Sequence, residues 1–578
     1  MYNFFNNKIS FTKIILIYSF YITVVFNFFV FEKINNNLQN STESIFLILY
    51  FYILVFLTLY FFLIIFFATF GFRFFLKPLI CIFLIFSSIS LHFKIYYGIN
   101  ANSEIILSFS DAIIEKNFTE IFDLLSLKLF MFIFFLGLIP FSPLLFIEIK
   151  YPKISKEFFI RFVVIAIILL IWVTLVAINY KNISLTARSN KIAGREAIPH
   201  YTLTSLFSVV KKGLKETESF KIIDTNPYTL NPNEEIIGVI VVGETARADR
   251  FSINNYKKNT NPLLAQKNII NYSNAESCGT LTRISVPCMF FLDNYKEFSV
   301  DKAKYQENLL DILQKTKTNI LWIENNSSCK SVCKNVDKID TITIDGSGVY
   351  DEITVQLLEN IFNTEEKYKD KKTIDIHKIY EILKKIKSSN KNFHNSKIFE
   401  DKNAVSYKNF IENKNKNKII VIHMAGSHGP KYFNRYPKKF EKFLPSCKSN
   451  NPQDCSQEEL SNAFDNTILY TDFVLSKLIE LLTKQEKKSF MIYASDHGES
   501  LGEMGIYLHG VPKIFAPKEQ THIPWIMWFS ENYKKKFNIK LKDQQQKITH
   551  EYFPHTILEA MRIKTKVFKK DKSLISSN

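Results

Sequence analysis

Residues 236–245 read IIGVIVVGET, a short β-branched run that ends in Gly243, Glu244 and Thr245. Such a run, closed by a glycine, predicts a buried strand. Three later runs have a similar composition, at Ile320–Ile323, Lys418–His423 and Phe490–Ala494. Helical patterns lie between the four runs, which predicts an α/β domain with a mainly parallel sheet covered by helices. In sheets of this kind, ligands bind beyond the carboxyl ends of the strands.

Three of these strand ends carry side chains suited to a metal ion or a phosphate. Glu244 follows the first strand, and Asp496 and His497 follow the last. Two carboxylates and an imidazole suit tetrahedral Zn²⁺, so we expect one tightly held zinc ion there. His428, after the third strand, and His509 are expected to bind phosphate or a second zinc ion. Weaker candidates are His423, His522 and Glu499, and the position of His423 within a strand favours a packed histidine.

The segment Ala275–Phe290, AESCGTLTRISVPCMF, places Thr280 between Cys278 and Cys288. The residues after Thr280 are expected to open a helix, whose first N–H groups attract phosphate. As the fourth zinc ligand, the hydroxyl of Thr280 would have a lowered pKa and would become a nucleophile. The alternative is that Thr280 only caps the helix, but the three strand ends favour the catalytic reading.

Six of the seven cysteines form close pairs after residue 270, and Cys81 lies in an apolar run. Local pairing in a segment outside the cytosol predicts disulfides, here 278–288, 329–333 and 447–455. The spacing of Cys329 and Cys333 also suits zinc, but no matching pair of ligands follows at a suitable distance.

Most of the 55 phenylalanines lie before residue 180, in long apolar runs. Five runs approach or reach the ~20 residues that span a bilayer. They lie at about Ile14–Phe31, Ile45–Phe67, Pro78–Phe93, Leu129–Ile147 and Phe162–Asn179. Lysine and arginine gather before the first run and in alternate loops, which places the N-terminus in the cytoplasm and the chain after residue 180 outside.

These patterns divide the 578 residues into three parts. We expect a five-span transmembrane domain at 1–180, an interfacial linker at 181–233 and a catalytic domain at 234–578. Within the last, residues 365–417 are crowded with Lys, Asn and Ser, apart from a helical stretch near Ile374–Ile386, and are expected to form an exposed insertion. The net charge of +18 suits an anionic membrane surface, and the sequence has no nucleic-acid-binding motif.

Five segments, in order along the chain, resemble the motifs of one family. They are GETARADRFSINNY (243–256), SCGTLTRISVPCMF (277–290), ENNSSCKSVC (324–333), HMAGSHGPKYFNRYP (423–437) and SDHGESLGEMGIYLHGVP (495–512). The chain resembles, over essentially its whole length, the bacterial phosphoethanolamine–lipid A transferases. Those are membrane-anchored enzymes of the alkaline phosphatase/sulfatase superfamily.

The resemblance implies a two-step transfer of phosphoethanolamine from phosphatidylethanolamine to a lipid A phosphate or core sugar. Thr280 matches the family nucleophile, and Glu244, Asp496 and His497 match the zinc ligands. His428 and His509 match a phosphate or second-zinc site, and Lys330 and Ser327 match a polar cluster assigned to substrate. The implied location is the bacterial inner membrane, with the catalytic domain in the periplasm. Lipid A would lose negative charge, which implies resistance to cationic peptides such as polymyxins. We expect a monomer that contacts membrane lipids.

Two departures from the family pattern concern the substrates. Ser108 and Ala112 stand where an Asn and a Thr are expected in the periplasmic loop, and the insertion at 365–417 looks additional. The same chemistry would serve a phosphoethanolamine or phosphoglycerol transferase that acts on another surface glycan or on protein. A hydrolase and a non-catalytic metal sensor are less favoured, because the chain is membrane-anchored and all the catalytic residue types are present.

Overall fold

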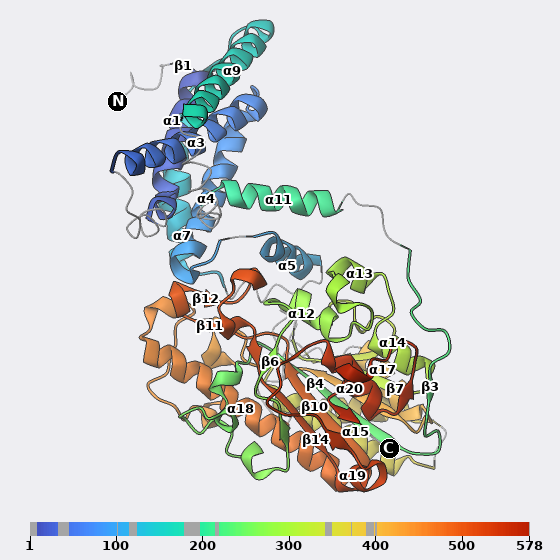
Figure 1. Cartoon of the computed structure of the whole chain (residues 1–578). Helices are drawn as coiled ribbons and strands as arrows, with labels where there is room; N and C mark the ends of the chain where they lie inside the picture. The colour runs from blue at the N-terminus through green and yellow to red at the C-terminus, as the bar shows by residue number, and fades with distance from the viewer. Residues whose placement is uncertain are drawn as a thin grey trace. The chain divides into compact units, whose positions relative to one another are not determined.

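The structure is a computed structural model of the chain (Figure 1). It describes residues 8–32, 45–100, 102–114, 124–178, 197–213, 219–326, 328–341, 349–370, 373–388, 398 and 401–576. The chain divides into two compact units, and a short stretch of the membrane part's sequence belongs to the second of them. The first unit comprises residues 1–107 and 125–215, and the second comprises residues 108–124 and 216–578.

The first unit is helical, because its apolar runs satisfy their backbone groups internally, as a bilayer requires. Its helices are α1 (Phe11–Phe26), α3 (Ile45–Phe70), α4 (Leu76–Tyr97), α7 (Leu127–Phe132), α8 (Ile139–Phe146), α9 (Ile154–Ile178) and α11 (His200–Gly213). A π-helical segment, Ile133–Leu138, joins α7 to α8. Within the described residues, four helices are long and apolar enough to cross a membrane: Leu49–Phe70, Leu76–Tyr97, Leu127–Phe146 and Ser155–Ile178.

The predicted count of five spans is not confirmed. Most of the first predicted run lies in α1, which has 16 residues and ends at Asn27, and residues 28–32 are again helical. At 1.5 Å per residue this helix covers about 24 Å, less than the ~30 Å of a hydrocarbon core. The buried side chain of Asn27 explains why the helix ends, since it donates to the carbonyl oxygens of Ile22 (3.2 Å) and Ile198 (2.7 Å).

The second unit is built on a seven-stranded sheet in the order β5-β14-β10-β4-β9-β7-β8. The strands are β4 (Ile236–Gly243), β5 (Ile270–Asn271), β7 (Asn319–Glu324), β8 (Asp337–Asp340), β9 (Lys418–His423), β10 (Lys488–Ser495) and β14 (Trp525–Phe529). The five strands from β10 to β8 are parallel, and β14 is antiparallel to both of its neighbours. The predicted mainly parallel sheet is therefore present, and its four predicted strands are the central ones.

Alternate residues of the central strand β4 face two separate hydrophobic cores. Ile237, Val239 and Val241 join one core, together with side chains of α15 (Glu352–Lys367), α16 (Ile376–Ser388), α17 (Asp401–Glu412) and α18 (Gln457–Lys484). Ile236, Ile240 and Val242 join the other, with α12 (Thr282–Met289), α14 (Leu309–Lys315), α19 (Glu531–Phe537) and α20 (Tyr552–Ala560). Because both faces are covered, the strand reads as a continuous apolar run.

Smaller elements complete the second unit and the loop before it. They are α5 (Ser103–Ile114), α13 (Val300–Lys304), the three-stranded sheet β13 (His522–Ile523), β6 (Ala275–Glu276) and β16 (Ile548–Thr549), and the hairpin of β11 (Ser500–Leu501) and β12 (Tyr507–Leu508). Two two-stranded pairs of the second unit join β3 (Tyr228–Thr229) to β17 (Ile563–Lys564) and β15 (Lys540–Leu541) to β18 (Ile575–Ser576). In the first unit, β1 (Ile9–Ser10) pairs with β2 (Ile149–Lys150).

The expectation of an exposed insertion at 365–417 is wrong for its described part. Both α16 and α17 bury one face in the core that α15 and α18 share. Ile379, Leu383 and Ile386 on α16 are spaced at helical intervals and are buried, while lysines occupy the opposite face. The polar composition reflects this outer face, and the segment forms part of the fold.

The cysteines after residue 270 form three disulfides: Cys278–Cys288, Cys329–Cys333 and Cys447–Cys455. Cys81 is free. With their sulfurs bonded to each other, Cys329 and Cys333 do not form the alternative zinc site in this structure.

Candidate active site

Three predicted ligands meet where β4 and β10 end side by side. Gly243 is paired with Ser495 in the sheet, so Glu244 and the Asp496–His497 pair leave neighbouring strands at one level. The ligand atoms of Glu244, Asp496 and His497 all lie within 4.8 Å of one another, and all three side chains are fully buried. Burial of two carboxylates is costly unless a cation or hydrogen bonds compensate.

The hydrogen bonds around His497 and Asp496 suit metal binding. His497 Nδ1 lies 3.0 Å from the carbonyl oxygen of Gly498, so this nitrogen carries the proton and Nε2 keeps its lone pair. Asp496 Oδ1 accepts from the backbone N–H groups of Thr245 (3.1 Å) and His497 (2.7 Å). Asp496 Oδ2 lacks a hydrogen-bond donor among the described residues and lies 3.3 Å from His497 Nε2. Burial also lowers the pKa of His497, which favours the neutral ligand form.

The hydroxyl at this group belongs to Thr282. Its Oγ1 lies 3.1 Å from Glu244 Oε2 and 3.3 Å from His497 Nε2. Thr282 is also the first residue of α12, so it stands at the positive end of a helix dipole. It is half-buried, which leaves it accessible to a substrate. The geometry thus gives Thr282 the contacts that a metal-activated nucleophile needs.

The predicted place of Thr280 among the ligands is wrong in this structure. Thr280 is 2% exposed, and its Oγ1 donates to the carbonyl oxygen of Val511 at 2.7 Å. Its own carbonyl oxygen accepts from the N–H of Gly510 at 3.0 Å. Two hydrogen bonds therefore attach Thr280 to the segment that follows His509. Leu281 is extended and precedes the helix, so threonines on either side of it face different surroundings.

His428 and His509 lie beside the ligand group, as the sequence predicted. The ring centroids of His509 and His497 are 4.5 Å apart, and those of His509 and His428 are 5.3 Å apart. His509 Nδ1 lies 3.4 Å from Glu499 Oε1, and burial raises the pKa of Glu499 to about 8. Burial, with Arg435 and the two neighbouring histidines, holds the pKa of His428 well below its usual range. The ring N–H of an imidazole at this place can donate to a phosphate oxygen.

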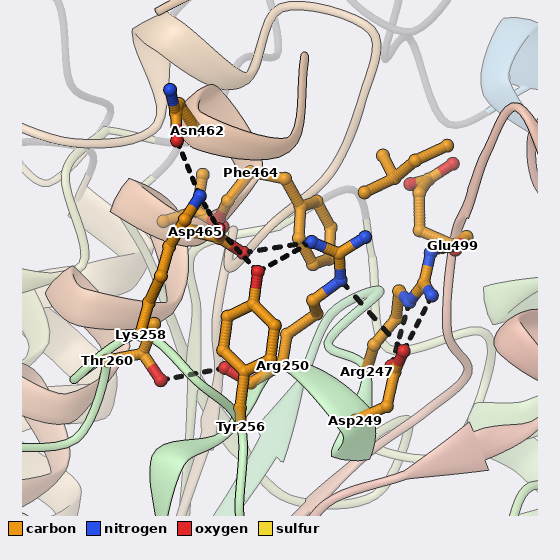
Figure 2. A network of polar contacts seen from close by, with 12 residues as sticks. Arg247, Asp249, Arg250, Tyr256, Lys258, Thr260, Asn462, Phe464, Asp465 and Glu499 are labelled. Carbon is orange, nitrogen blue, oxygen red and sulfur yellow. Dashed lines mark hydrogen bonds and ion pairs between the residues drawn. The ribbon is translucent and has the colours of Figure 1, made fainter. Parts of the chain in front are cut away.

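The GETARADR motif attaches the end of β4 to its surroundings (Figure 2). Arg247 is buried, pairs with Asp249 and Glu503, and donates to the carbonyl oxygen of Glu499 at 3.0 Å. On the other side, the buried Asp465 of α18 accepts from Lys258 and Tyr256 at 2.7 and 2.8 Å. These contacts fix the segment after Glu244 against both α18 and the chain that follows His497.

The remaining predicted residues have varied positions. Lys330 lies in the loop closed by Cys329 and Cys333, in a left-handed conformation with φ of 46°. Ser327 lies outside the described residues. His522 belongs to β13 and bonds the carbonyl oxygen of Ser273 at 2.7 Å, which indicates a structural role. Ser108 and Ala112 both lie on α5.

Residues after β7 also reach the site, and sequence reasoning missed them. Asn326 Nδ2 donates to Glu244 Oε2 at 2.6 Å and lies 3.2 Å from His423 Nε2. The signal was available, because Ile320–Ile323 was predicted as a strand of the same sheet and its carboxyl end should meet the others. Two asparagines at that end were the clue.

Comparisons with known proteins match both the membrane part and the second unit of the chain. A sulfatase family model matches residues 237–563, and one described as "Phosphoethanolamine transferase EptA/EptB" matches residues 59–214. "Phosphatidylethanolamine transferase Mcr-1" of Escherichia coli is 32% identical over 471 residues, which cover 79% of each chain. The chain belongs to the phosphoethanolamine transferase family, within the alkaline phosphatase/sulfatase superfamily.

Two further relatives of the family extend over nearly the whole length. "Phosphoethanolamine transferase EptA" of Escherichia coli K12 is 29% identical over 575 residues, 96% of this chain and 94% of that protein. The solved lipooligosaccharide phosphoethanolamine transferase A of Neisseria meningitidis covers 98% of this chain and 99% of its own, with a TM-score of 0.81 and 26% identity. The helical membrane region and the sulfatase-type domain therefore both match one known phosphoethanolamine transferase.

Proposed function

We propose that this protein transfers phosphoethanolamine from phosphatidylethanolamine to lipid A through a covalent intermediate on Thr282. The observation that carries the proposal is the position of Thr282 Oγ1 against Glu244 and His497 at the start of α12. The names of the relatives, phosphatidylethanolamine transferase and lipooligosaccharide phosphoethanolamine transferase, support the donor and the acceptor class.

The proposed metal is Zn²⁺, held by Glu244, Asp496, His497 and Thr282. The donor set fits, since two carboxylates, a neutral imidazole and a hydroxyl suit a tetrahedral site. When bound, zinc would lower the pKa of the threonine hydroxyl and offset negative charge on phosphate. A second zinc ion or a phosphate at His428 and His509 remains part of the proposal.

In the first step, Thr282 Oγ forms a bond to phosphorus while the bond from phosphorus to the diacylglycerol oxygen breaks. Diacylglycerol leaves with the proton that the threonine hydroxyl gives up. In the second step, a phosphate oxygen of lipid A attacks the same phosphorus, the bond to Thr282 Oγ breaks, and Thr282 Oγ takes up the proton that the attacking phosphate group loses. The N-terminus of α12 favours the negative phosphate in both steps, and His428 and His509 are placed to hold its oxygens.

The location and the outcome follow from lipid substrates. We propose an inner-membrane protein with a cytoplasmic N-terminus, a periplasmic second unit and activity as a monomer. Addition of a cationic amine would reduce the negative charge of lipid A and weaken the binding of polymyxins. Comparison of lipid A by mass spectrometry in cells with and without the gene tests the acceptor, and unchanged lipid A would reject it.

The covalent intermediate can be tested directly. The purified chain is incubated with phosphatidylethanolamine alone, digested, and the peptide that contains both threonines is sequenced by tandem mass spectrometry. We expect a mass gain of one phosphoethanolamine on Thr282 that disappears when lipid A is added. A gain on Thr280 would reassign the nucleophile, and release of diacylglycerol without any gain would reject the two-step mechanism.

A further inference from the structure

A chain of buried polar side chains lies behind Glu244 and begins where β7 and β9 end. Glu324 is the last residue of β7 and His423 the last of β9, and the two are paired in the sheet register. His423 Nδ1 lies 2.8 Å from Glu324 Oε1, and His423 Nε2 lies 3.2 Å from Asn326 Nδ2. Asn326 then donates to Glu244 Oε2 at 2.6 Å. Glu324, His423 and Glu244 are fully buried, and Asn326 is nearly so.

The donors and acceptors of this series of polar side chains fit together in only one direction, from Asn326 to Glu244 and from His423 to Glu324. Glu324 accepts hydrogen bonds from the backbone N–H of Asn326 (2.9 Å) and from Trp322 Nε1 (2.9 Å), and its Oε1 lies in close polar contact with His423 Nδ1 at 2.8 Å. A carboxylate has no proton to give, so His423 Nδ1 must be the protonated nitrogen. His423 Nε2 is then an acceptor, and it receives one N–H of the Asn326 amide. The same amide nitrogen donates its other N–H to Glu244.

We propose that Glu324 and His423 are positioning residues that set the zinc affinity of the site through Asn326. They fix the orientation of the Asn326 amide, which holds Oε2 of Glu244. Glu244 Oε1 then lies on the side of His497, 3.6 Å from its Nε2. The inference rests on the proposed role of Glu244 as a zinc ligand. Partners of metal ligands commonly change metal affinity 10- to 100-fold.

A purely structural role explains this arrangement less well. A buried carboxylate and imidazole are costly to desolvate, and apolar residues of similar volume are often as stable in such a place. Two polar groups at the ends of adjacent central strands are better explained by what they contact. Asn326 donates a hydrogen bond to Glu244, a predicted metal ligand, and no apolar side chain could replace that contact.

The test is the zinc affinity of the purified full chain, measured by competition with a chromophoric chelator of known affinity. The variants are Glu324→Gln, His423→Leu and Asn326→Ala. We expect each to weaken zinc binding about 10- to 100-fold. Glu324→Gln is informative because an amide accepts at one atom only, whereas three N–H groups converge on this side chain. Trp322→Phe is the matched control, since it removes a donor to Glu324 outside the path to Glu244, and we expect less than about a threefold change.

Stability is measured in parallel, as the melting temperature in excess chelator. Asn326 lies beyond the strand end, so Asn326→Ala still tests the contact with Glu244 if Glu324→Gln and His423→Leu fail to fold. His423→Gln should recover part of the affinity lost in His423→Leu, because its amide can also donate and accept. If the variants lower the metal-free melting temperature but leave zinc affinity unchanged, the positioning role is rejected while the zinc site stands. If the parent chain itself binds no zinc, the proposed metal site is rejected as well.

Discussion

The ends of β4 and β10 and the segment Cys278–Thr282 both supply groups to the site, but they differ in how far sequence determines them. The strand ends follow from sheet geometry, because parallel neighbours end at one edge and Gly243 pairs with Ser495. The segment before α12 is not part of the seven-stranded sheet, so no strand pairing sets its position. Its threonines, Thr280 and Thr282, differ in contacts only because of where the helix begins.

The comparison shows that a motif fixes residue types more firmly than it fixes roles. Both threonines lie inside the disulfide loop of Cys278 and Cys288, and only Leu281 separates them. A shift of two residues in the start of the helix is enough to exchange the proposed nucleophile with the threonine that bonds Val511. Experiments can therefore test separately the groups positioned by the sheet and the groups positioned by the segment Cys278–Thr282.

The two threonines should differ most in activity. Thr282→Ala removes the proposed nucleophile, and we expect at least about a 1,000-fold loss of transfer. Thr280→Val keeps the shape but loses the bond to Val511, worth about 1 kcal/mol, so the loss should stay below about tenfold. Transfer of radiolabelled phosphoethanolamine to lipid A measures both. Thr282→Ser is the control that keeps a hydroxyl. Equal losses of transfer in Thr282→Ala and Thr280→Val would mean that the two threonines do not differ in role.

The strand-end ligands should show a large effect on metal content as well as on rate. In His497→Ala or Asp496→Ala, one of four proposed zinc ligands is missing, and we expect about 100-fold slower transfer and loss of tightly bound zinc. Metal analysis of the purified variants checks this. His522→Ala is the matched control, because its imidazole bonds Ser273 instead of the ligand group. Full zinc occupancy in His497→Ala would contradict the ligand set.

Most of the sheet and the grouping of three proposed ligands could be predicted from the sequence. Strand runs such as Ile236–Val242 are buried on both faces, so composition alone marks them. The burial of α16 was harder to predict than its helical pattern, since the helix carries lysines on one face and its buried residues are few. The contact of Asn27 with Ile198 at the end of α1 is long-range, and no local pattern reveals it. The role of Asn326 also depends on three strands meeting, which only the assembled sheet displays.

The disulfide beside the threonines should affect both stability and activity. A double Cys278→Ser/Cys288→Ser variant opens a loop with a sequence separation of 10, for which chain entropy gives about 2–3 kcal/mol of stability. The Cys447–Cys455 pair, with a separation of 8, is a matched control away from α12. Thermal melts should show similar losses in the two double variants. Transfer below the melting range should fall mainly in the first, and an equal fall in both would mean that the first bond does not serve the threonine segment.

The smallest expected effect concerns an ion pair next to the proposed nucleophile. Arg283 Nε lies 2.5 Å from Asp111 Oδ2, and their side chains are 13% and 29% exposed. Asp111 lies on α5 between Ser108 and Ala112, in the part of that helix assigned to the second unit. Since Thr282 and Arg283 are adjacent, loss of the pair should loosen the start of α12.

A partly exposed pair contributes about 1 kcal/mol, so Asp111→Asn should slow transfer roughly fivefold. The exchange Asp111→Arg/Arg283→Asp should recover part of the rate lost in either single reversal, because the pair is rebuilt with opposite polarity. If the double exchange slows transfer by as much as the two single reversals combined, the two residues act independently and the contact does not position Thr282.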